Sequence, residues 1–381
     1  MYSIHLEILR TLVEEYRQEG IEVTFRHELP FRQAISCRLR ESYAETDPDC
    51  VFFLNTFPNG FLEWIFQSTE VETCCPIPRV VWMTDDFAYA PGSDRGFSNR
   101  DIVFCVDETY LPRAEGLGAG EAYFLPTATS LPGPGDYSPE YDHPIVFVGS
   151  VTDLRSELSN LRPAAKAWLQ QSASAVIQHV RPESITILDE ANQANVVAVA
   201  ESICMRMGKQ HLTGDQALAY ALYVIGNTYK RVWLVRELIP LGIAVYGNAD
   251  WKTLLESEER HAYRGPAPYE EVAHIYASAK ICLNIHSLQC PTCLNPRDFD
   301  VPMAGGFLLS DWVPDVEKDY LVDEKEAVFY KSTPRLKELA NHYLNNDQPR
   351  REIATAGRER VLRDHRYRNR AQKSLELLRA R

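Results

Sequence analysis

The sequence has no apolar run that approaches the ~20 residues needed for a membrane-spanning helix. Its first residues, MYSIHLEILRTLVEEYRQEG, have the spacing of an amphipathic helix and lack the apolar core and cleavage site of a signal peptide. Basic residues are in the minority, because 40 Lys and Arg accompany 53 Asp and Glu and give a net charge of −13. General nucleic-acid-binding proteins are usually basic. We therefore expect a cytoplasmic protein with no membrane span and no nucleic-acid partner.

The sequence also lacks the motifs of several enzyme classes. There is no Walker loop and no GxGxxG followed by a ribose-binding acid, so ATPase and dehydrogenase chemistry have no support. The nine cysteines are odd in number, and runs such as VFCVD and KICLNIH indicate buried, reduced thiols. The pairs Cys74–Cys75 and Cys290–Cys293 fall in different predicted domains, and a structural zinc site needs four converging ligands. We therefore predict no metal site.

What the chain does have is two series of alternating helices and strands, separated by a Pro- and Gly-rich segment at 131–144. Uninterrupted apolar strands between helices indicate parallel sheets covered on both faces. The length suits two domains, so we predict an α/β fold with two doubly wound, Rossmann-like domains. Strands are expected at 21–27, 50–55, 79–86, 101–108, 122–128, 145–150, 243–248, 280–286 and 306–311. Helices are expected at 3–19, 32–45, 60–70, through most of 153–240, at 269–279, from 296 and beyond 333.

The segment NPRDFDVPMAGGFLLSD, at 295–311, predicts a short helix with a well-defined start. Asn295 can cap the helix, Pro296 suits its first position, and Asp298 can reach back to the cap. The following Pro302 and the Gly pair at 305–306 end the helix. Because it follows a strand of a doubly wound sheet, its start is expected where such sheets bind ligands.

Arg297 and Asp300 lie one turn apart at this helix start and share a face. Helix amides and an arginine suit a phosphate, and a carboxylate can accept from the hydroxyls of a ribose. Together they would form a nucleoside-diphosphate cradle. The alternative is an ordinary exposed ion pair on a capped helix, which contributes little.

The longer run LNIHSLQCPTCLNPRDFDVPMAGGFLLSD resembles the C-terminal domain of CgeB-like, spore-maturation-type glycosyltransferases. These belong to the GT-B superfamily, which includes glycosyltransferase group 1. The resemblance covers about 143–381 well and the N-terminal half more weakly. The family's usual Glu, which contacts the donor ribose in related transferases, is Asp300 here. The residues that match the family pattern are Asn295, Arg297, Phe299, Gly305, Gly306 and Leu308.

The resemblance implies a GT-B fold, with two Rossmann-like domains facing a cleft and a C-terminal helix that crosses back to the N-terminal domain. It implies an acceptor domain at 1–135, a nucleotide-sugar-binding domain at 143–345 and helices at 346–381 that pack back toward the N-terminal domain. The nucleotide-diphosphate sugar would be a co-substrate, with no cofactor and no metal, because helix amides and an arginine can stabilise the leaving diphosphate. The strand that usually opens the family is not found at the start of this sequence.

The resemblance also implies which residues hold the donor. Gly149 and Ser150 would border the diphosphate, and Arg155 would contact it. His286 could contact a phosphate or be a satisfied loop histidine. The full implied donor-binding set is Gly149, Ser150, Arg155, Tyr246, Gly247, Asn248, Gly265, Pro266, His286, Asn295, Arg297 and Asp300.

Catalytic residues are expected at two places. In WMTDDF, at 82–87, Asp85 and Asp86 follow a strand that reads as buried, so one of them could deprotonate an acceptor hydroxyl. Capping of a turn is the alternative role for these acids. Arg297 would offset the charge that develops as the sugar–phosphate bond breaks.

The favoured interpretation is a glycosyltransferase that moves a sugar from a nucleotide-sugar donor to an unknown acceptor, which could be a protein, a glycan or a small molecule. Two alternatives remain. One is a non-catalytic nucleotide- or sugar-binding structural protein with the same fold, and the other is a nucleotide-sugar epimerase. Fold alone does not decide among them.

Overall fold

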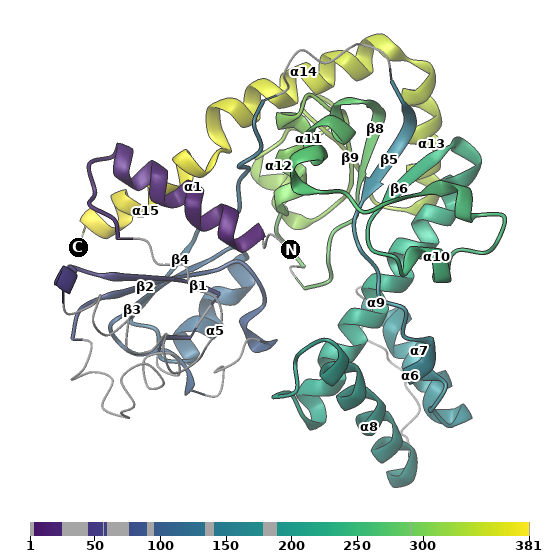
Figure 1. Ribbon diagram of the computed structural model, residues 1–381, viewed down its shortest axis with the longest axis horizontal. Coiled ribbons are helices and arrows are strands. Elements are labelled where there is room, and N and C mark those ends of the chain that lie inside the picture. Colours follow the sequence, from purple (N-terminus) through teal and green to yellow (C-terminus); the bar gives the residue numbers. More distant parts are fainter. Residues whose placement is uncertain are drawn as a thin grey trace. The chain divides into compact units, whose positions relative to one another are not determined.

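The computed structural model describes residues 4–24, 45–55, 57–58, 76–89, 95–133, 141–177, 189–289 and 291–380 (Figure 1). The chain divides into two compact units. Unit 1 comprises Met1–Ser130, Thr292–Leu294 and Asp364–Arg381, and unit 2 comprises Leu131–Pro291 and Asn295–Arg363. The helices expected at 32–45 and 60–70 fall almost entirely outside the described residues.

Unit 1 is built on a parallel sheet whose described strands follow the order β1-β2-β3-β4. Every residue of β2 and β3 is buried, as expected for strands that are covered on both faces. The strands are β1 (Val51–Leu54), β2 (Arg79–Met83), β3 (Asp101–Cys105) and β4 (Glu121–Phe124). The short helices that follow β2 and β3 are η1 (Phe87–Tyr89), η3 (Glu108–Tyr110) and α5 (Leu111–Gly116).

Two helices from distant parts of the sequence pack together in unit 1, α1 (Ile4–Gln18) and α15 (Tyr367–Arg379) (Figure 1). The hydroxyls of Tyr16 and Ser374 hydrogen-bond across this contact at 2.8 Å. Tyr367 also sets its ring edge-on against Trp82 of β2, with ring centroids 5.9 Å apart. The predicted return of the C-terminal helix to the N-terminal domain is therefore confirmed.

The sheet of unit 1 contains a buried ion pair between neighbouring strands. Arg79 opens β2, Asp101 opens β3, and neither side chain has any exposed surface. The arginine Nε lies 2.5 Å from Asp101 Oδ1, and Asp101 Oδ2 accepts the backbone N–H of Ser98 at 2.8 Å. Burial makes such a pair costly to break, because removal of one charge leaves the other uncompensated.

We expect Asp101→Asn to destabilise the protein by about 3–5 kcal/mol, because it removes the charge of the buried carboxylate that pairs with Arg79. Urea unfolding followed by circular dichroism would measure the change. The matched control is Asp49→Asn, since Asp49 is exposed in the same unit, and it should stay within about 0.5 kcal/mol of wild type. An equal effect of the two substitutions would contradict the prediction.

Unit 2 is built on six parallel strands in the order β10-β9-β8-β5-β6-β7 (Figure 1). The chain adds strands on one side of β5 first and then on the other, so the topological switch point lies between β5 and β8. Ligands of doubly wound sheets bind outside the carboxyl ends of the strands at this point. The strands are β5 (His143–Val148), β6 (Ile243–Tyr246), β7 (Tyr263–Gly265), β8 (Ala279–Asn284), β9 (Leu308–Asp311) and β10 (Val328–Tyr330).

The connections between these strands are helical. The first is long and includes α9 (Gly214–Leu238), a 25-residue helix on which α7 and α8 pack. The other α-helices of unit 2 are α6 (Arg155–Leu158), α7 (Pro163–Ile177), α8 (Glu190–Arg206), α10 (Trp251–Leu254), α11 (Tyr269–Ala277), α12 (Pro296–Met303), α13 (Thr333–Asn345) and α14 (Asp347–Asp364). The 3-10 helices are η4 (Ile239–Leu241), η5 (Arg260–Ala262) and η6 (Pro314–Lys318).

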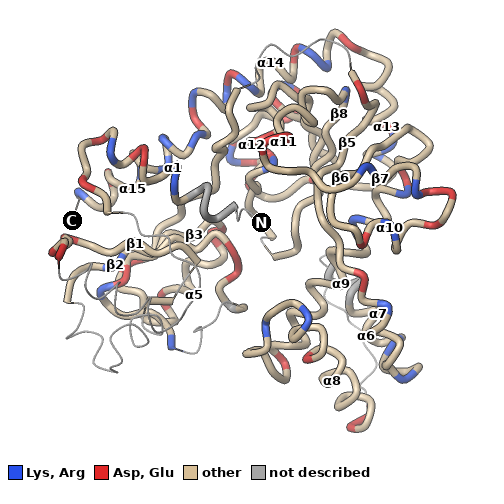
Figure 2. Tube along the Cα trace, viewed as in Figure 1, with Lys and Arg blue, Asp and Glu red and all other residues tan. Residues whose placement is uncertain are grey.

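The core of unit 2 lies between the sheet and helices α9 and α13. Within it, the rings of Phe147 of β5 and Trp251 of α10 meet edge to face, with centroids 6.1 Å apart. Figure 2 shows charges of both signs along α14, whereas β5 and β6 carry no Lys, Arg, Asp or Glu. Apolar side chains therefore fill the interior of the sheet, and most charged side chains lie at the surface.

The predicted α/β fold with two parallel-sheet units is confirmed, but three details differ. The described part of the strand expected at 21–27, residues 21–24, is not a strand. The three-residue strands β7 and β10 were not predicted, because so few residues show no periodicity. The tail expected as one piece at 346–381 is divided, with most of α14 in unit 2 and α15 in unit 1.

Candidate functional site

The loop after β5 lies at the switch point and is held in one conformation by side chains from neighbouring elements. Gly149 accepts a hydrogen bond from Trp251 Nε1 at 2.7 Å, and its own N–H donates to the carbonyl of Tyr246 at 2.9 Å. Asn248 bonds both the N–H and the carbonyl of Val151, at 3.1 and 2.7 Å. Ser150 is exposed, and no residue that the structure describes accepts from its amide.

The end of β6 approaches this loop so closely that only glycine fits. A Cβ on Gly247 would lie 2.3 Å from the carbonyl oxygen of Gly149 and 2.8 Å from Trp251 Nε1. The N–H of Gly247 donates to the carbonyl of Gly265 at 2.8 Å, which ties the ends of β6 and β7 together. Backbone groups therefore line this part of the sheet edge.

Helix α12 begins in a complete capping box, as predicted. Asn295 Oδ1 accepts the N–H of Arg297 at 2.8 Å, and Asp298 Oδ2 accepts the N–H of Asn295 at 2.8 Å. The N–H of Asp298 is also engaged, with the carbonyl of Asn295 at 3.0 Å. These two amides have partners within the protein, and their expected role in a phosphate cradle stays a prediction. The side chain of Arg297 remains for that role, together with the helix dipole.

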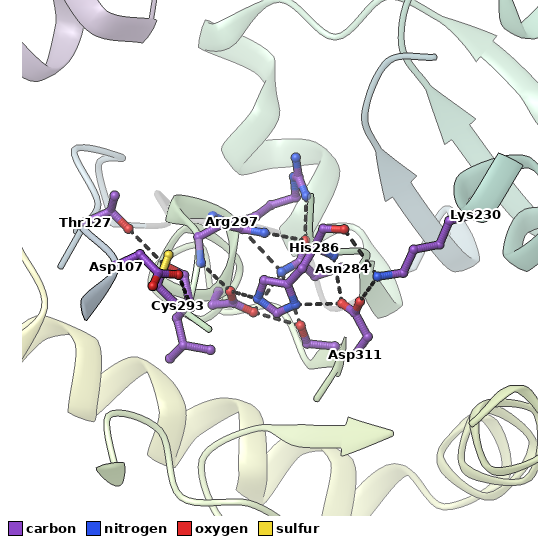
Figure 3. A network of polar contacts seen from close by, with 12 residues as sticks. Asp107, Thr127, Lys230, Asn284, His286, Cys293, Arg297 and Asp311 are labelled. Atoms are coloured by element: carbon purple, nitrogen blue, oxygen red, sulfur yellow. Dashed lines mark hydrogen bonds and ion pairs between the residues drawn. The ribbon is translucent and has the colours of Figure 1, made fainter. Parts of the chain in front are cut away.

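The capping acid is also part of a buried polar network behind α12 (Figure 3). Asp298 Oδ1 accepts from Asn284 Nδ2 and from Ser310 Oγ, each at 2.8 Å. Asn284 ends β8 and uses its oxygen to accept from Arg297 Nη1 at 2.5 Å. Strand-end residues thus fix both the start of α12 and the direction of its arginine.

His286 occupies the centre of this network and is only 3% exposed (Figure 3). Its Nε2 lies 2.7 Å from Asp298 Oδ2, and its Nδ1 lies 2.6 Å from Asp311 Oδ1. Burial alone would lower the pKa of His286, but the carboxylates of Asp298 and Asp311 outweigh burial and raise it to about 10. The same ring and Lys230 hold the pKa of Asp311 well below its usual range, although burial opposes them.

Three cationic side chains lie at the carboxyl ends of β5, β8 and β9, two of them on α9. Lys230 Nζ lies 2.6 Å from Asp311 Oδ2 (Figure 3). Arg231 Nη1 donates to the carbonyl of Ser150 at 2.5 Å, while its buried Nε has no partner among the described residues. Burial, and then the nearby charge of Arg297, lower the pKa of Arg231 to about 10. Clustered cations with unused donors are suited to a multiply charged anion.

Residues 230–376 match a protein-family model described as glycosyl transferase-like. They include α9 from Lys230 onward, the network around His286 and the whole of α12. Among solved structures, the DNA-modifying enzyme β-glucosyltransferase aligns with a TM-score of 0.53 and 11% identity, over 97% of this chain and 92% of that chain. The chain has the GT-B fold, and its residues 230–376 are similar to the glycosyl transferase-like family.

Other GT-B structures align over most of their length. Sucrose-phosphate synthase from Thermosynechococcus elongatus has 12% identity and a TM-score of 0.49, over 98% of this chain and 92% of that chain. Anabaena HepE in complex with UDP-glucose has 10% identity and a TM-score of 0.46, over 98% and 89%. A search of curated proteins found no significant match to the sequence. In the described part of the GT-B chain, no helix has both the length and the hydrophobicity to span a bilayer.

Several donor-binding residues implied by the family resemblance have other partners in this GT-B chain. Arg155 is exposed and pairs with Asp153, with Nη2 and Oδ2 at 2.6 Å. The hydroxyl of Tyr246 bonds His143 Nε2 at 2.9 Å, at the opposite end of β5 from the site. Their expected contacts with the donor stay predictions.

The remaining implied residues lie on the same edge of the sheet. Gly265 has a φ of +117°, which favours glycine, and Pro266 after it is exposed. Asp300 is half-buried on α12 and near Tyr276, whose pKa is raised mainly by burial and also by this carboxylate. Nothing in these positions conflicts with contacts to a base or a ribose.

In unit 1, the two candidate bases differ in their surroundings. Asp85 Oδ2 accepts from Asn55 Nδ2 at 2.9 Å, and Asn55 Oδ1 accepts the N–H of Asp85 at 3.1 Å. Asn55 has a φ of +50°, an uncommon conformation that often marks functional sites. Asp86 instead pairs with Arg113, with Nη1 and Oδ1 at 3.1 Å. Both acids therefore stay candidates for the catalytic base.

Asp107, which follows β3, takes the capping role that strand-end acids often have. Its carboxylate accepts from the N–H and hydroxyl of Thr292, at 3.0 and 2.6 Å, and from the N–H of Cys293 at 3.2 Å (Figure 3). These bonds and those from Thr109 lower the pKa of Asp107, although its burial acts in the opposite direction. Asp107 thus fixes the segment that leads into α12.

Of the four cysteines in the two pairs, only Cys293 lies among the described residues. Cys74, Cys75 and Cys290 lie outside the described residues. Within the described ranges, no group of three or more His, Cys, Asp or Glu side chains is arranged to hold a metal ion. Cys293 is a buried free thiol.

The sequence did not lead us to predict Lys230 and Arg231 on α9 as site residues. It also did not lead us to predict Ser310 and Asp311 at the end of β9. Lys230 and Arg231 lie in the middle of a long helix, where a basic pair usually faces solvent, so no local signal distinguished them. Ser310 and Asp311 end a buried strand, and the argument applied to Asp85 would have selected them.

Proposed function

We propose that the protein is a CgeB-like glycosyltransferase that transfers a sugar from a nucleoside-diphosphate sugar to an acceptor. The observation that carries this proposal is the placement of Lys230, Arg231 and Arg297 at the carboxyl ends of β9, β5 and β8, around the switch point of unit 2. This point is where Rossmann-like sheets bind nucleotides, and the segment matches the glycosyl transferase-like family. A diphosphate is the anion whose charge and shape fit these donors.

In the proposed complex, the diphosphate accepts from Arg231 and Arg297 and from the unused amide of Ser150. Lys230, which pairs with Asp311 at the end of β9, supplies a further positive charge. Asp300 accepts from the ribose hydroxyls, and the backbone of Gly247 and Gly265 borders the base. In this arrangement, side chains bind the charged diphosphate, and the backbone at the edge of the sheet contacts the base.

In the reaction, the acceptor oxygen bonds the anomeric carbon of the sugar while the bond from that carbon to the phosphate oxygen breaks. The proton of the acceptor hydroxyl passes to a carboxylate of unit 1, for which Asp85 is the first candidate. The nucleoside diphosphate leaves with an additional negative charge, which Arg231 and Arg297 stabilise. In this proposal, the arginines supply the charge that a divalent metal supplies elsewhere.

The test is a binding panel of nucleoside diphosphates measured by titration calorimetry. UDP is the first probe, because uridine diphosphoglucose is the substrate named for the β-glucosyltransferase that shares this fold. We expect binding to the wild type and a roughly 10- to 100-fold weaker affinity in Arg231→Gln, since a charge-assisted hydrogen bond contributes about 1.5–3 kcal/mol. The control is Arg335→Gln on α13, which is exposed. Failure of every nucleoside diphosphate to bind would refute the proposal.

Incubation with a sugar nucleotide separates the proposed enzyme from its alternatives. A transferase releases nucleoside diphosphate, and adds the sugar to an acceptor or slowly to water. A structural binding protein leaves the nucleotide sugar intact, and an epimerase returns it with inverted configuration at one carbon. Mass spectrometry and proton NMR distinguish these products.

We also propose that the protein works in the cytoplasm. The buried free thiols of Cys105, Cys204, Cys282 and Cys293 support a reducing compartment. Immunolocalisation with compartment markers would test this placement.

A further inference from the structure

The geometry around His286 fixes the charge of its ring. Asp298 Oδ2 also accepts the N–H of Asn295 at 2.8 Å, and Asp311 Oδ1 also accepts the N–H of His286 itself at 2.7 Å. An ionised carboxylate oxygen can only accept, so each ring nitrogen donates when Asp298 and Asp311 are both charged. A neutral imidazole has one N–H, and only the imidazolium has two.

The remaining oxygens of both carboxylates also accept from other donors, and such hydrogen bonds stabilise the charged form of a carboxylate. Asp298 Oδ1 accepts from Asn284 and Ser310, and Asp311 Oδ2 accepts from Lys230. The network therefore contains two carboxylates and two cations and is close to neutral. This count of charges does not include the guanidiniums of Arg231 and Arg297.

We propose that His286 is a positioning residue whose positive charge balances one of the two carboxylates behind α12 and so keeps Arg231 and Arg297 available to the diphosphate. The inference rests on the proposed function, because it takes a donor diphosphate as the ligand. A diphosphate ester carries two negative charges, which match the two arginines. A neutral residue at 286 would leave a surplus carboxylate charge beside the anion site.

Histidine suits this position better than other cations because its two donors lie on opposite edges of a rigid ring. The ring bridges the end of β8 to the start of α12 through Asp298 and to the end of β9 through Asp311. A purely structural bridge would affect stability without changing the affinity for anions. The two roles therefore predict different measurements.

The raised pKa of His286, about 10, means that the ring remains charged throughout the physiological range. The facing charged groups are Asp298, Asp311 and Lys230, with Arg297 on the adjoining helix. Because the folded pKa exceeds the unfolded value of about 6.5, this stabilisation is complete below that value and is lost as pH rises through the folded pKa.

The first test compares His286→Gln with His286→Lys, using inorganic pyrophosphate as a probe that carries the diphosphate charge without a base. We expect the neutral variant to bind pyrophosphate at least about 10-fold more weakly than wild type, because it adds an uncompensated charge near the site. The charged variant should return to within about threefold of wild type. His211→Gln, at an exposed histidine of unit 2, is the matched control and should bind as wild type does.

Equal weakening in His286→Gln and His286→Lys, or no weakening in either, would overturn the inference while leaving the proposed function intact. Absence of pyrophosphate and UDP binding by the wild type would overturn both. Nitrogen-15 NMR of the histidine-labelled wild type provides a second measurement that does not depend on a variant that folds. We expect both His286 nitrogens to be protonated at pH 8, and a neutral ring would overturn the inference.

Discussion

Replacing Arg297 with alanine is expected to lower donor turnover by roughly 100- to 1,000-fold, the usual loss when one donor to a developing anion is removed. Arg297 is the cation on the first turn of α12, and Asn284 holds its Nη1 in place. Steady-state release of nucleoside diphosphate from a nucleotide sugar measures the effect. The larger part should appear in kcat, because negative charge on the phosphate grows as the sugar bond breaks.

Two further variants make this prediction specific. Arg297→Lys keeps the charge but loses the planar fork, so its activity should fall between those of alanine and wild type. Arg335→Ala removes an exposed arginine from α13 and should leave turnover unchanged. The capping box does not use the Arg297 side chain, so thermal unfolding should be nearly the same for all variants. Turnover equal to wild type in Arg297→Ala would remove Arg297 from the proposed mechanism.

The second large effect is expected from Asp85→Asn, which should slow transfer to the acceptor by roughly 100- to 10,000-fold through loss of the general base. Donor affinity should not change, because Asp85 belongs to unit 1 and the donor residues to unit 2. Calorimetry with UDP and a transfer assay measure the two quantities separately. Asparagine keeps the shape of the side chain and can still pair with Asn55.

Asp86→Asn serves as the comparison. Asp86 already pairs with Arg113, so its replacement should reduce transfer less than Asp85→Asn does. If Asp86→Asn proves the more damaging substitution, the two roles must be exchanged. If both variants transfer sugar at the wild-type rate, neither acid is the base.

Most strands of this fold could be predicted, because they are mainly apolar runs of four to six residues bounded by turn residues. The capping box of α12 was also predictable, since Asn295, Pro296 and Asp298 each have a local preference for their positions. Strands β7 and β10 could not be predicted, because three residues at the edge of a sheet carry no periodic signal. Tertiary pairing alone makes them strands.

In the candidate site, too, some residues could be predicted from the sequence and others could not. Arg297 and the glycines of the sheet edge follow from local sequence patterns and from the family resemblance. Lys230 and Arg231 approach the site only because α9 packs against the sheet, and His286 is charged only because two distant acids enclose it. Such features depend on side chains that come from separate elements, and no single segment reveals them.

The make-up of unit 1 also bears on how the chain folds as it is synthesised. Its sheet comes from residues before 131, but α15, which covers Trp82 and pairs with α1, comes from residues after 363. On the ribosome, unit 2 can therefore acquire nearly all its residues while α15 is still in the exit tunnel. Until translation delivers that helix, the apolar surface beneath it stays uncovered, and nascent chains should rely on chaperones during this interval.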